Sequence, residues 1–195
     1  MGREFELKYT ATRAQQDALA ASFGEFTSIA METTYYDTPD GALSRQHITL
    51  RRRFENGVSV CTVKTPGDSH GRGEWDCDCG RIEDAIPVLR GRGCDADLEE
   101  LTKSGLVPIC GARFVRQAKL VDLGGCEVEL ALDRGALLGG GREVPLCEVE
   151  VELKSGEEAM AVAFAAQLAK KFDLQPERNS KFRRALMLVK GEDHG

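Results

Sequence analysis

Carboxylates and cations alternate with apolar residues at the start of the sequence. In the segment EFELKY, Glu4, Glu6 and Lys8 occupy every second position. A β-strand sends residues i, i+2 and i+4 to one face, whereas a helix spreads the same residues around its axis. The spacing therefore predicts a strand with one charged face and one apolar face. Taken alone, such a strand is typical of a sheet edge whose charged side faces water.

The same alternation recurs along most of the predicted strands. Each of the following sets shares one strand face: Thr49, Arg51 and Arg53; Thr62 and Lys64; Arg72, Glu74, Asp76 and Asp78; Glu127, Glu129, Ala131 and Asp133; Glu148, Glu150 and Glu152. Carboxylates that follow one another on a strand face repel, which costs stability unless cations lie among them. The alternation is compatible with two structures: an open sheet with a solvated charged face, or a closed barrel with a charged interior.

A charged interior would be a ligand site with a definable chemistry. Clusters of carboxylate oxygens select hard cations such as Mg²⁺ or Mn²⁺, and Mg²⁺ commonly bridges carboxylates to substrate phosphates. Arginine binds phosphate through paired hydrogen bonds, and lysine binds it as a point charge. The residue types therefore predict a site for a phosphate-bearing anion together with a divalent metal.

Length and composition indicate one globular domain. The chain has 195 residues, 42% of them hydrophobic, and its formal net charge of −6 argues against a broad nucleic-acid surface. It has no apolar run long enough to span a bilayer, and MGREFELK lacks the apolar core of a signal peptide, so we expect a cytoplasmic protein. The seven scattered cysteines favour free thiols, and Cys77-x-Cys79 lacks the further ligands that structural zinc needs.

Capping and turn signals predict the order of the elements. Helices are expected over Arg13–Phe23 behind a Thr12/Gln15 capping box, to about Phe172 behind a Ser155/Glu158 capping box, and after a cap at Asn179 or Ser180. A mostly helical region is expected over 81–105. Strands are expected in a short segment before Asp37 and over 47–55, 58–65, 74–79, 113–122, 126–133 and 144–154, with an Asn56-Gly57 turn joining the second and third.

Blocks of the sequence, taken in order, resemble the CYTH-domain family, or triphosphate tunnel metalloenzymes. Glu4-x-Glu6-x-Lys8 is similar to the ExExK signature of that family. The further blocks are YYDTPD at 35–40, LRRR at 50–53, TVK at 62–64, RGE at 72–74, ALDRG at 131–135, PLCEVEVELKSG at 145–156 and SKFRR at 180–184, of which YYDTPD and LCEVEVELKSG most resemble the bacterial inorganic triphosphatases. The resemblance implies an α+β fold in which eight antiparallel strands close into a barrel, the triphosphate tunnel, with helices packed outside.

The resemblance also implies roles for individual charged residues. The implied ligands of Mg²⁺ or Mn²⁺ are Glu4, Glu6, Asp133, Glu148 and Glu150. The implied phosphate-binding cations are Lys8, Arg51, Arg53, Lys64, Arg72, Arg116 and Lys181. The implied catalytic set is Glu4, Glu6, Lys8, Glu148 and Glu150, whereas no individual role follows for Glu74, Glu129 and Glu152. Arg113 has the opposite strand parity to Arg116, and Arg183 is expected at the rim or on the surface.

The activity that follows from the resemblance is metal-dependent hydrolysis of inorganic triphosphate to diphosphate and phosphate. Two alternatives stay open: an adenylate cyclase of the same family, and a module that binds polyphosphate or nucleotide without turnover. Trp75 has the parity opposite to Glu74, so it is expected to point outward and to offer no internal platform for a base. The expected partner is a small-molecule triphosphate, without nucleic acid or membrane, and a homodimer stays open.

Longer members of the family continue into a second, helical, His-rich domain that is associated with polyphosphate. This sequence carries only the first domain, so we expect a single domain over 1–195 and no role in polyphosphate granules.

Overall fold

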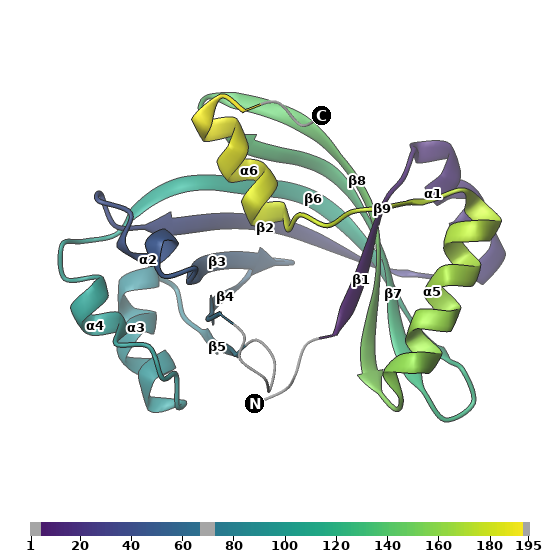
Figure 1. The fold of residues 1–195 in the computed structure, drawn as a ribbon, viewed down its shortest axis with the longest axis horizontal. Coiled ribbons are helices and arrows are strands. Elements are labelled where there is room, and N and C mark those ends of the chain that lie inside the picture. Colours follow the sequence, from purple (N-terminus) through teal and green to yellow (C-terminus); the bar gives the residue numbers. More distant parts are fainter. Residues whose placement is uncertain (1–4, 67–72, 193–195) are drawn as a thin grey trace.

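The computed structural model describes residues 5–66 and 73–192, and over these residues it combines one antiparallel sheet with six helices (Figure 1). The chain is therefore α+β, as expected. Among the described helices, none has the length and apolar character needed to cross a lipid bilayer. In chain order the elements are β1 Glu6–Thr10, α1 Arg13–Phe23, β2 Thr27–Asp37, α2 Ala42–Arg45, β3 Thr49–Glu55, β4 Val58–Lys64, β5 Glu74–Asp78, α3 Ile82–Gly91, α4 Leu98–Leu101, β6 Val107–Asp122, β7 Glu127–Gly139, β8 Arg142–Ser155, α5 Glu158–Phe172, β9 Gln175–Pro176 and α6 Lys181–Lys190.

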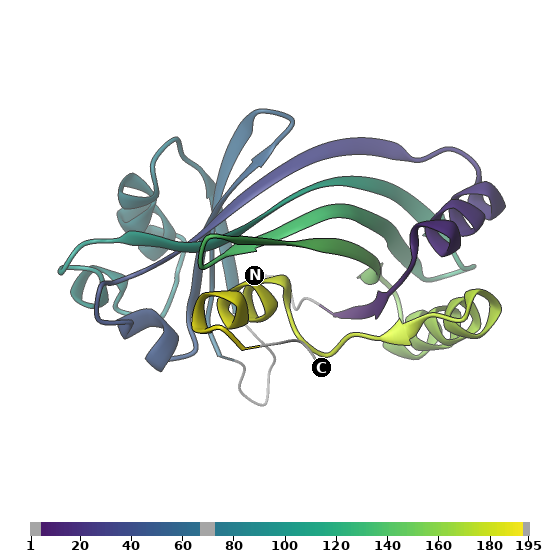
Figure 2. The same cartoon turned by 90° about the horizontal axis from the view of Figure 1, so that it is seen from above.

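The sheet is open, so the expected closed eight-stranded barrel is wrong. Its nine strands follow the order β5-β4-β3-β2-β6-β7-β8-β1-β9, and within 5–66 and 73–192 no ladder joins β5 to β1 or β9. A barrel needs both edges of every strand to be paired. Here the second edge of β1 pairs with the two-residue β9, while β5 pairs with β4 alone. The long strands curve instead, so the sheet arches over its inner face (Figure 1 and Figure 2).

Local signals predicted several element boundaries correctly. Thr12 and Gln15 form a full capping box at the start of α1. Asn56 and Gly57 take positive φ values of 49° and 87° in the turn between β3 and β4, as a tight hairpin requires. Ser180 caps α6, because its hydroxyl oxygen accepts a hydrogen bond from the backbone N–H of Arg183 at 3.1 Å.

Strand pairing overrides the local signals elsewhere. Both β6, which begins at Val107, and β7, which continues to Gly139, are longer than predicted. The ladder between the two strands continues past Gly111 and Gly135. The second capping box is wrong, since Ser155 ends β8 opposite Glu127 and α5 begins after Glu157 without a side-chain cap. His47 does not begin a strand: it takes a positive φ of 57° in the turn before β3.

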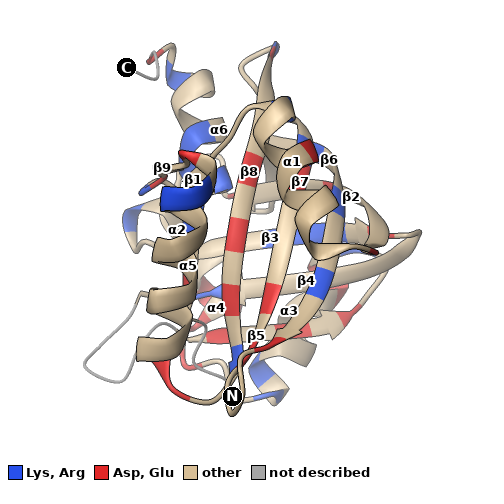
Figure 3. Cartoon of the chain, turned by 90° about the vertical axis from the view of Figure 1, so that its right-hand side faces the viewer, with Lys and Arg blue, Asp and Glu red and all other residues tan. Residues whose placement is uncertain are grey.

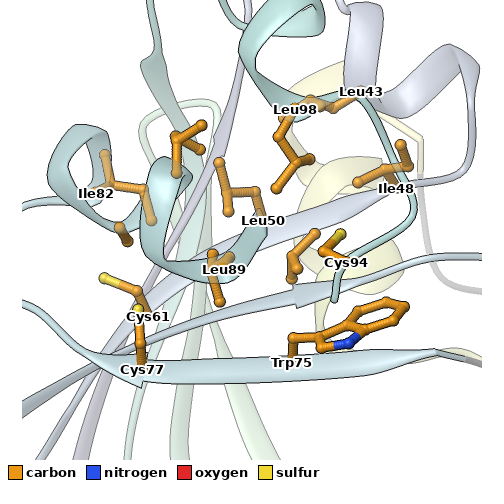
Figure 4. Packing of buried hydrophobic residues seen from close by; sticks show 13 residues of the cluster. Leu43, Ile48, Leu50, Cys61, Trp75, Cys77, Ile82, Leu89, Cys94 and Leu98 are labelled. Atoms are coloured by element: carbon orange, nitrogen blue, oxygen red, sulfur yellow. The ribbon is translucent and has the colours of Figure 1, made fainter. Parts of the chain in front are cut away.

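The outer face of the sheet carries two apolar clusters, as the strand parity predicts. On β3 to β5, Leu50, Cys61 and Trp75 pack against Leu89 of α3, in the cluster drawn in Figure 4. Trp75 thus points away from the side that carries Glu74, which confirms its predicted orientation. On β1, β7 and β8 a second cluster forms with α1 and α5; among its members are Tyr9, Leu130, Val149, Val151, Leu19 and Leu168.

Helix α6 lies on the inner face, where it forms a third cluster. Its Ala185 and Leu188 are buried with Phe114 and Leu137 of the sheet. Gly139 approaches α6 so closely that a Cβ atom there would lie 2.4 Å from the carbonyl oxygen of Ala185. This packing holds the first turn of α6, with Lys181, over the charged part of the inner face.

Substituting Gly139→Ala should push α6 away from β7, because the added methyl group meets backbone that cannot yield. We expect a loss of about 2 kcal/mol in the free energy of unfolding, the usual cost of overpacking a core. Urea denaturation would measure it. Gly80→Ala is the matched control, because a Cβ atom at Gly80 meets nothing within 4 Å. Equal unfolding free energies for the two variants would contradict this account of the α6 contact.

Candidate active site

The inner face encloses a charged cavity of about 350 Å³. Residues from β1, β2, β3, β4, β5, β6 and β8 reach it, together with the first turn of α6. Eight of the predicted site residues line this cavity: Glu6, Lys8, Arg51, Arg53, Lys64, Arg116, Glu150 and Lys181. Glu74 and Glu152, for which the sequence predicted no role, line it too. The structure therefore brings together acids and bases that are distant in the sequence.

Strand register places the acidic residues in adjacent rows. On β1 and β8, Glu6 lies opposite Glu152 and Lys8 lies opposite Glu150. On the other side of β8, Asp133 lies opposite Glu148. Figure 3 shows the acidic residues spaced along β8. Since successive residues of a strand point to opposite faces, all of these side chains enter the inner face.

Asp133, Glu148 and Glu150 form a buried cluster that we call the acidic triad. Their carboxylate oxygens lie within 4.8 Å of one another. The ammonium nitrogen of Lys181 lies among them, 2.8 Å from Asp133, 2.7 Å from Glu148 and 2.6 Å from Glu150. Glu148 and Asp133 are fully buried. The triad therefore has its first counterion in α6.

Two guanidinium groups complete the charge balance of the triad. Arg116 forms a bidentate pair with Asp133, with N···O distances of 2.8 and 2.7 Å, and also contacts Glu150. Arg184, one helical turn after Lys181, contacts Glu148. Three cations thus stand against three carboxylates, which satisfies the requirement that buried charges be paired.

The pKa values of the two glutamates of the triad are shifted in opposite directions. Burial raises the pKa of Glu148 to about 7, with Lys181 opposing the shift and Glu150 adding to it. Burial alone would also raise the pKa of Glu150, but Lys181 and Arg116 outweigh it and hold that pKa well below its usual range. The triad therefore has Glu150 firmly ionised and Glu148 closer to accepting a proton.

The opposite wall of the cavity consists of cations on β3 and β4. Lys64 lies 3.1 Å and Arg51 lies 3.6 Å from the carboxylate of Glu74, which the two share. The Nε atom of Arg51 is buried and has no hydrogen-bond partner among residues 5–66 and 73–192. The β3 and β4 wall thus presents Arg51, Arg53 and Lys64 to the cavity.

Arg53 is the third cation of this wall, and burial disfavours its charge. It donates a hydrogen bond to Thr33 Oγ1 at 3.3 Å and another to Glu55 at 3.4 Å, both of them long. Burial lowers the pKa of Arg53, and with the neighbouring charges of Arg51 and Arg116 acting in the same direction that pKa is about 10. A buried cation that lines a cavity creates a favourable position for an anionic ligand.

A second, more open group of charges lies beside the triad. Lys8 contacts Glu6 at 3.1 Å, and Lys154 contacts Glu152 at 2.9 Å. Glu129 lies 3.8 Å from Arg116, so it faces the same side of the sheet. These acids keep part of their surface in solvent, which distinguishes them from the buried triad.

Several predicted residues lie elsewhere. Glu4 and Arg72 fall outside the described residues, so their placement stays a prediction. Asp133 and Glu148 lie behind Lys181 and Arg116 and do not line the cavity itself. Two arginines lie on the surface, as predicted by parity and position: Arg113 pairs with exposed Glu143, and Arg183 is exposed on α6.

Sequence reasoning missed three contributors to the site. Arg184 follows Lys181 by three residues, so helical spacing could have placed both on one face. Tyr35 and Phe182 line the cavity with ring centroids 5.0 Å apart, although they belong to β2 and α6. Nothing in the local sequence links two such distant aromatic residues.

Comparisons with known proteins agree with this arrangement. The CYTH-domain family model matches residues 2–186. The inorganic triphosphatase of Haemophilus influenzae is 32% identical over 200 residues, covering 96% of this chain and 55% of that protein, so this chain spans about half the length of that relative.

Solved structures show the same fold at lower identity. A candidate adenylate cyclase from Bacillus halodurans has a TM-score of 0.69 and 21% identity, with 93% of this chain and 96% of that chain covered. A candidate adenylyl cyclase from Hippeastrum, described as having a dominant triphosphatase activity, has a TM-score of 0.68 and 18% identity, with 98% and 97% covered. The family match across nearly the whole chain, joined to the curated relative, shows that this chain belongs to the CYTH-domain family.

Proposed function

We propose that this chain hydrolyses inorganic triphosphate to diphosphate and phosphate with the help of a divalent metal. One observation carries the proposal: Arg51, Arg53 and Lys64 line the same cavity as Glu6, Glu150 and Glu152, with the rest of the acidic triad buried behind Glu150. The Haemophilus influenzae relative is an inorganic triphosphatase, which supports the same reaction for the part of that protein that this chain matches.

The cation wall suits the phosphate chain of the substrate. Arg51, Arg53 and Lys64 project into one enclosed volume and can each hold a phosphate oxygen. Phosphoryl transfer depends on positioning and on neutralising negative charge, and it needs no covalent nucleophile from the protein. A triphosphate would bring phosphate oxygens to these three cations.

The acid wall suits a hard divalent cation by its donor chemistry. Glu6, Asp133, Glu148 and Glu150 would hold the ion, because they offer only oxygen ligands, which Mg²⁺ and Mn²⁺ prefer. Lys181 already lies among three of these carboxylates, so its ammonium competes with any cation that enters the triad. When bound, a divalent cation would supply charge neutralisation at the phosphate oxygens.

Product analysis tests the proposal directly. Purified protein would be incubated with inorganic triphosphate, ATP or thiamine triphosphate, each with Mg²⁺, Mn²⁺ or EDTA. Phosphate release from inorganic triphosphate, lost in EDTA, is the expected result. Cyclic AMP and diphosphate from ATP would instead support the cyclase alternative. Binding of triphosphate without any product would support a binding module, and either outcome would overturn the proposed hydrolysis.

Arg53→Met should weaken triphosphate binding while leaving the unliganded protein at least as stable. Loss of a charged contact to phosphate costs about 2 kcal/mol of binding free energy. The folded state holds the Arg53 proton less tightly than the unfolded chain does, so at neutral pH this charge opposes folding, and methionine removes that penalty. Calorimetry and thermal denaturation measure the two effects.

Arg52→Met is the matched control, because Arg52 lies next along β3 with its side chain on the other face, donating to the Gly80 carbonyl at 3.0 Å. Its triphosphate affinity should equal that of the unsubstituted protein. An equal loss of affinity in both variants would remove Arg53 from the phosphate site.

Glu6→Gln should abolish metal-dependent turnover while the fold survives. The substitution keeps the side-chain volume and removes a charge that lines the cavity. Activity would be measured over a range of Mn²⁺ concentrations, with circular dichroism as the check on folding. Glu143→Gln, on the outer face beside Arg113, is the control and should retain activity. Full activity of Glu6→Gln would contradict the assignment of Glu6 as a ligand.

Lys181→Met should destabilise the metal-free protein and increase its response to Mn²⁺. Removing one partner of a buried ion pair typically costs about 3 kcal/mol, because the remaining carboxylates repel one another. A divalent cation then meets no competing ammonium at the triad, so Mn²⁺ should raise the melting temperature more than it does in the unsubstituted protein. Lys170→Met, exposed on α5, serves as the control. An identical Mn²⁺ response in the Lys181 variant would show that the ammonium does not compete with metal.

A further inference from the structure

Helix α1 buries a glutamine against the back of the acidic triad. Gln16 is 1% exposed and, with Leu19, is one of the two buried residues of α1. Its amide nitrogen donates to the backbone carbonyl oxygens of Asp133 at 3.0 Å and of Glu148 at 2.9 Å. Both protons of the amide are therefore used by neighbouring strands.

The two residues that Gln16 holds by their backbones are the ones that face each other in the triad. Asp133 of β7 and Glu148 of β8 are register partners. Their side chains enter the inner face, where Lys181 contacts both, while Gln16 reaches their carbonyls from α1 on the outer side. One amide thus bridges β7 and β8 at the two residues whose carboxylates belong to the triad.

A second contact fixes which end of the Gln16 amide faces the strands. Arg134 donates from Nε to the Gln16 oxygen at 3.0 Å, and its guanidinium is held in turn by Asp17 at 2.7 Å. Since a guanidinium has no acceptor, the amide oxygen must face Arg134 and the amide nitrogen must face the two carbonyls. The orientation is therefore set by the protein.

We infer that Gln16 is a positioning residue for the acidic triad, acting through the backbones of Asp133 and Glu148. The inference rests on the proposed function, because the triad is there assigned to the metal and to charge balance. Groups that orient ligand-bearing residues from behind affect metal affinity and turnover without touching substrate. The cations of β3 and β4 lie on other strands, so the loss of Gln16 should spare the phosphate-binding wall.

The test substitutes Gln16→Met, which keeps the length of the side chain and removes both donors. We expect kcat for triphosphate to fall about 10-fold and the Kd for Mn²⁺ to rise about 10-fold, the range seen when such supporting groups are removed. KM for triphosphate should change little. Leu19→Ala is the matched control: it lies on the same helix and is fully buried, yet it has no polar contact with the triad strands. It should lower the melting temperature while kcat at low temperature is retained.

Two further measurements make the outcome decisive. Hydrogen exchange of peptides covering 128–133 and 147–150 should accelerate in Gln16→Met more than in Leu19→Ala, and this comparison holds even if the unsubstituted protein proves not to hydrolyse triphosphate. If Gln16→Met fails to fold, Arg134→Met becomes the deciding variant. It removes the contact that orients the Gln16 amide while leaving the amide donors in place, so it should lower kcat at unchanged KM. The inference is overturned if kcat and exchange in the deciding variant match those of Leu19→Ala at equal folded fraction.

Discussion

Three carboxylates buried side by side cannot all remain ionised unless cations lie between them, because burial removes the water that would otherwise screen their repulsion. In this chain the cations come from two separate parts of the sequence: Arg116 from β6, and Lys181 with Arg184 from α6. The acidic triad therefore has its full set of counterions only when α6 is packed on the sheet. Assembly of the site therefore requires α6 to be folded and in contact with the sheet.

The opposite wall of the cavity has a different arrangement of charges. Arg51 and Lys64 both contact the carboxylate of Glu74, and Arg53 donates hydrogen bonds of 3.3 Å to Thr33 and 3.4 Å to Glu55. A polyanion entering the cavity would bring further hydrogen-bond acceptors to these cations, whereas a metal entering the triad would compete with the ammonium of Lys181. We therefore expect the phosphate chain to be the easier ligand to bind, and a metal to bind with it by bringing further positive charge to the phosphate oxygens.

Strand parity is the part of this structure that the sequence predicts well. Period-two alternation separated Arg116 from Arg113 and Glu74 from Trp75, because each strand has one face inside and one outside. Closure of the sheet was not predictable in the same way, since it depends on whether β5 meets β1, and no local pattern encodes the pairing of two distant edges. The false capping box at Ser155 has a related cause, because the ladder with β7 extends the strand past the local signal.

The acidic surroundings of Lys181 were not predictable, for the same physical reason. As a cation in a family block it was expected to bind phosphate, yet its ammonium lies among three acids that only the folded sheet brings together. Its movement need not disturb the helix that carries it, because Ala185 and Leu188 anchor α6 independently in the apolar cluster. The lysine side chain has a flexible four-carbon stem, so its ammonium can move away from the acids while α6 stays packed on the sheet. The Phe114 ring lies 5.3 Å from that ammonium and already offers a neighbouring surface that attracts cations. Replacement of the Lys181 ammonium by a metal ion at the triad thus requires the motion of one side chain.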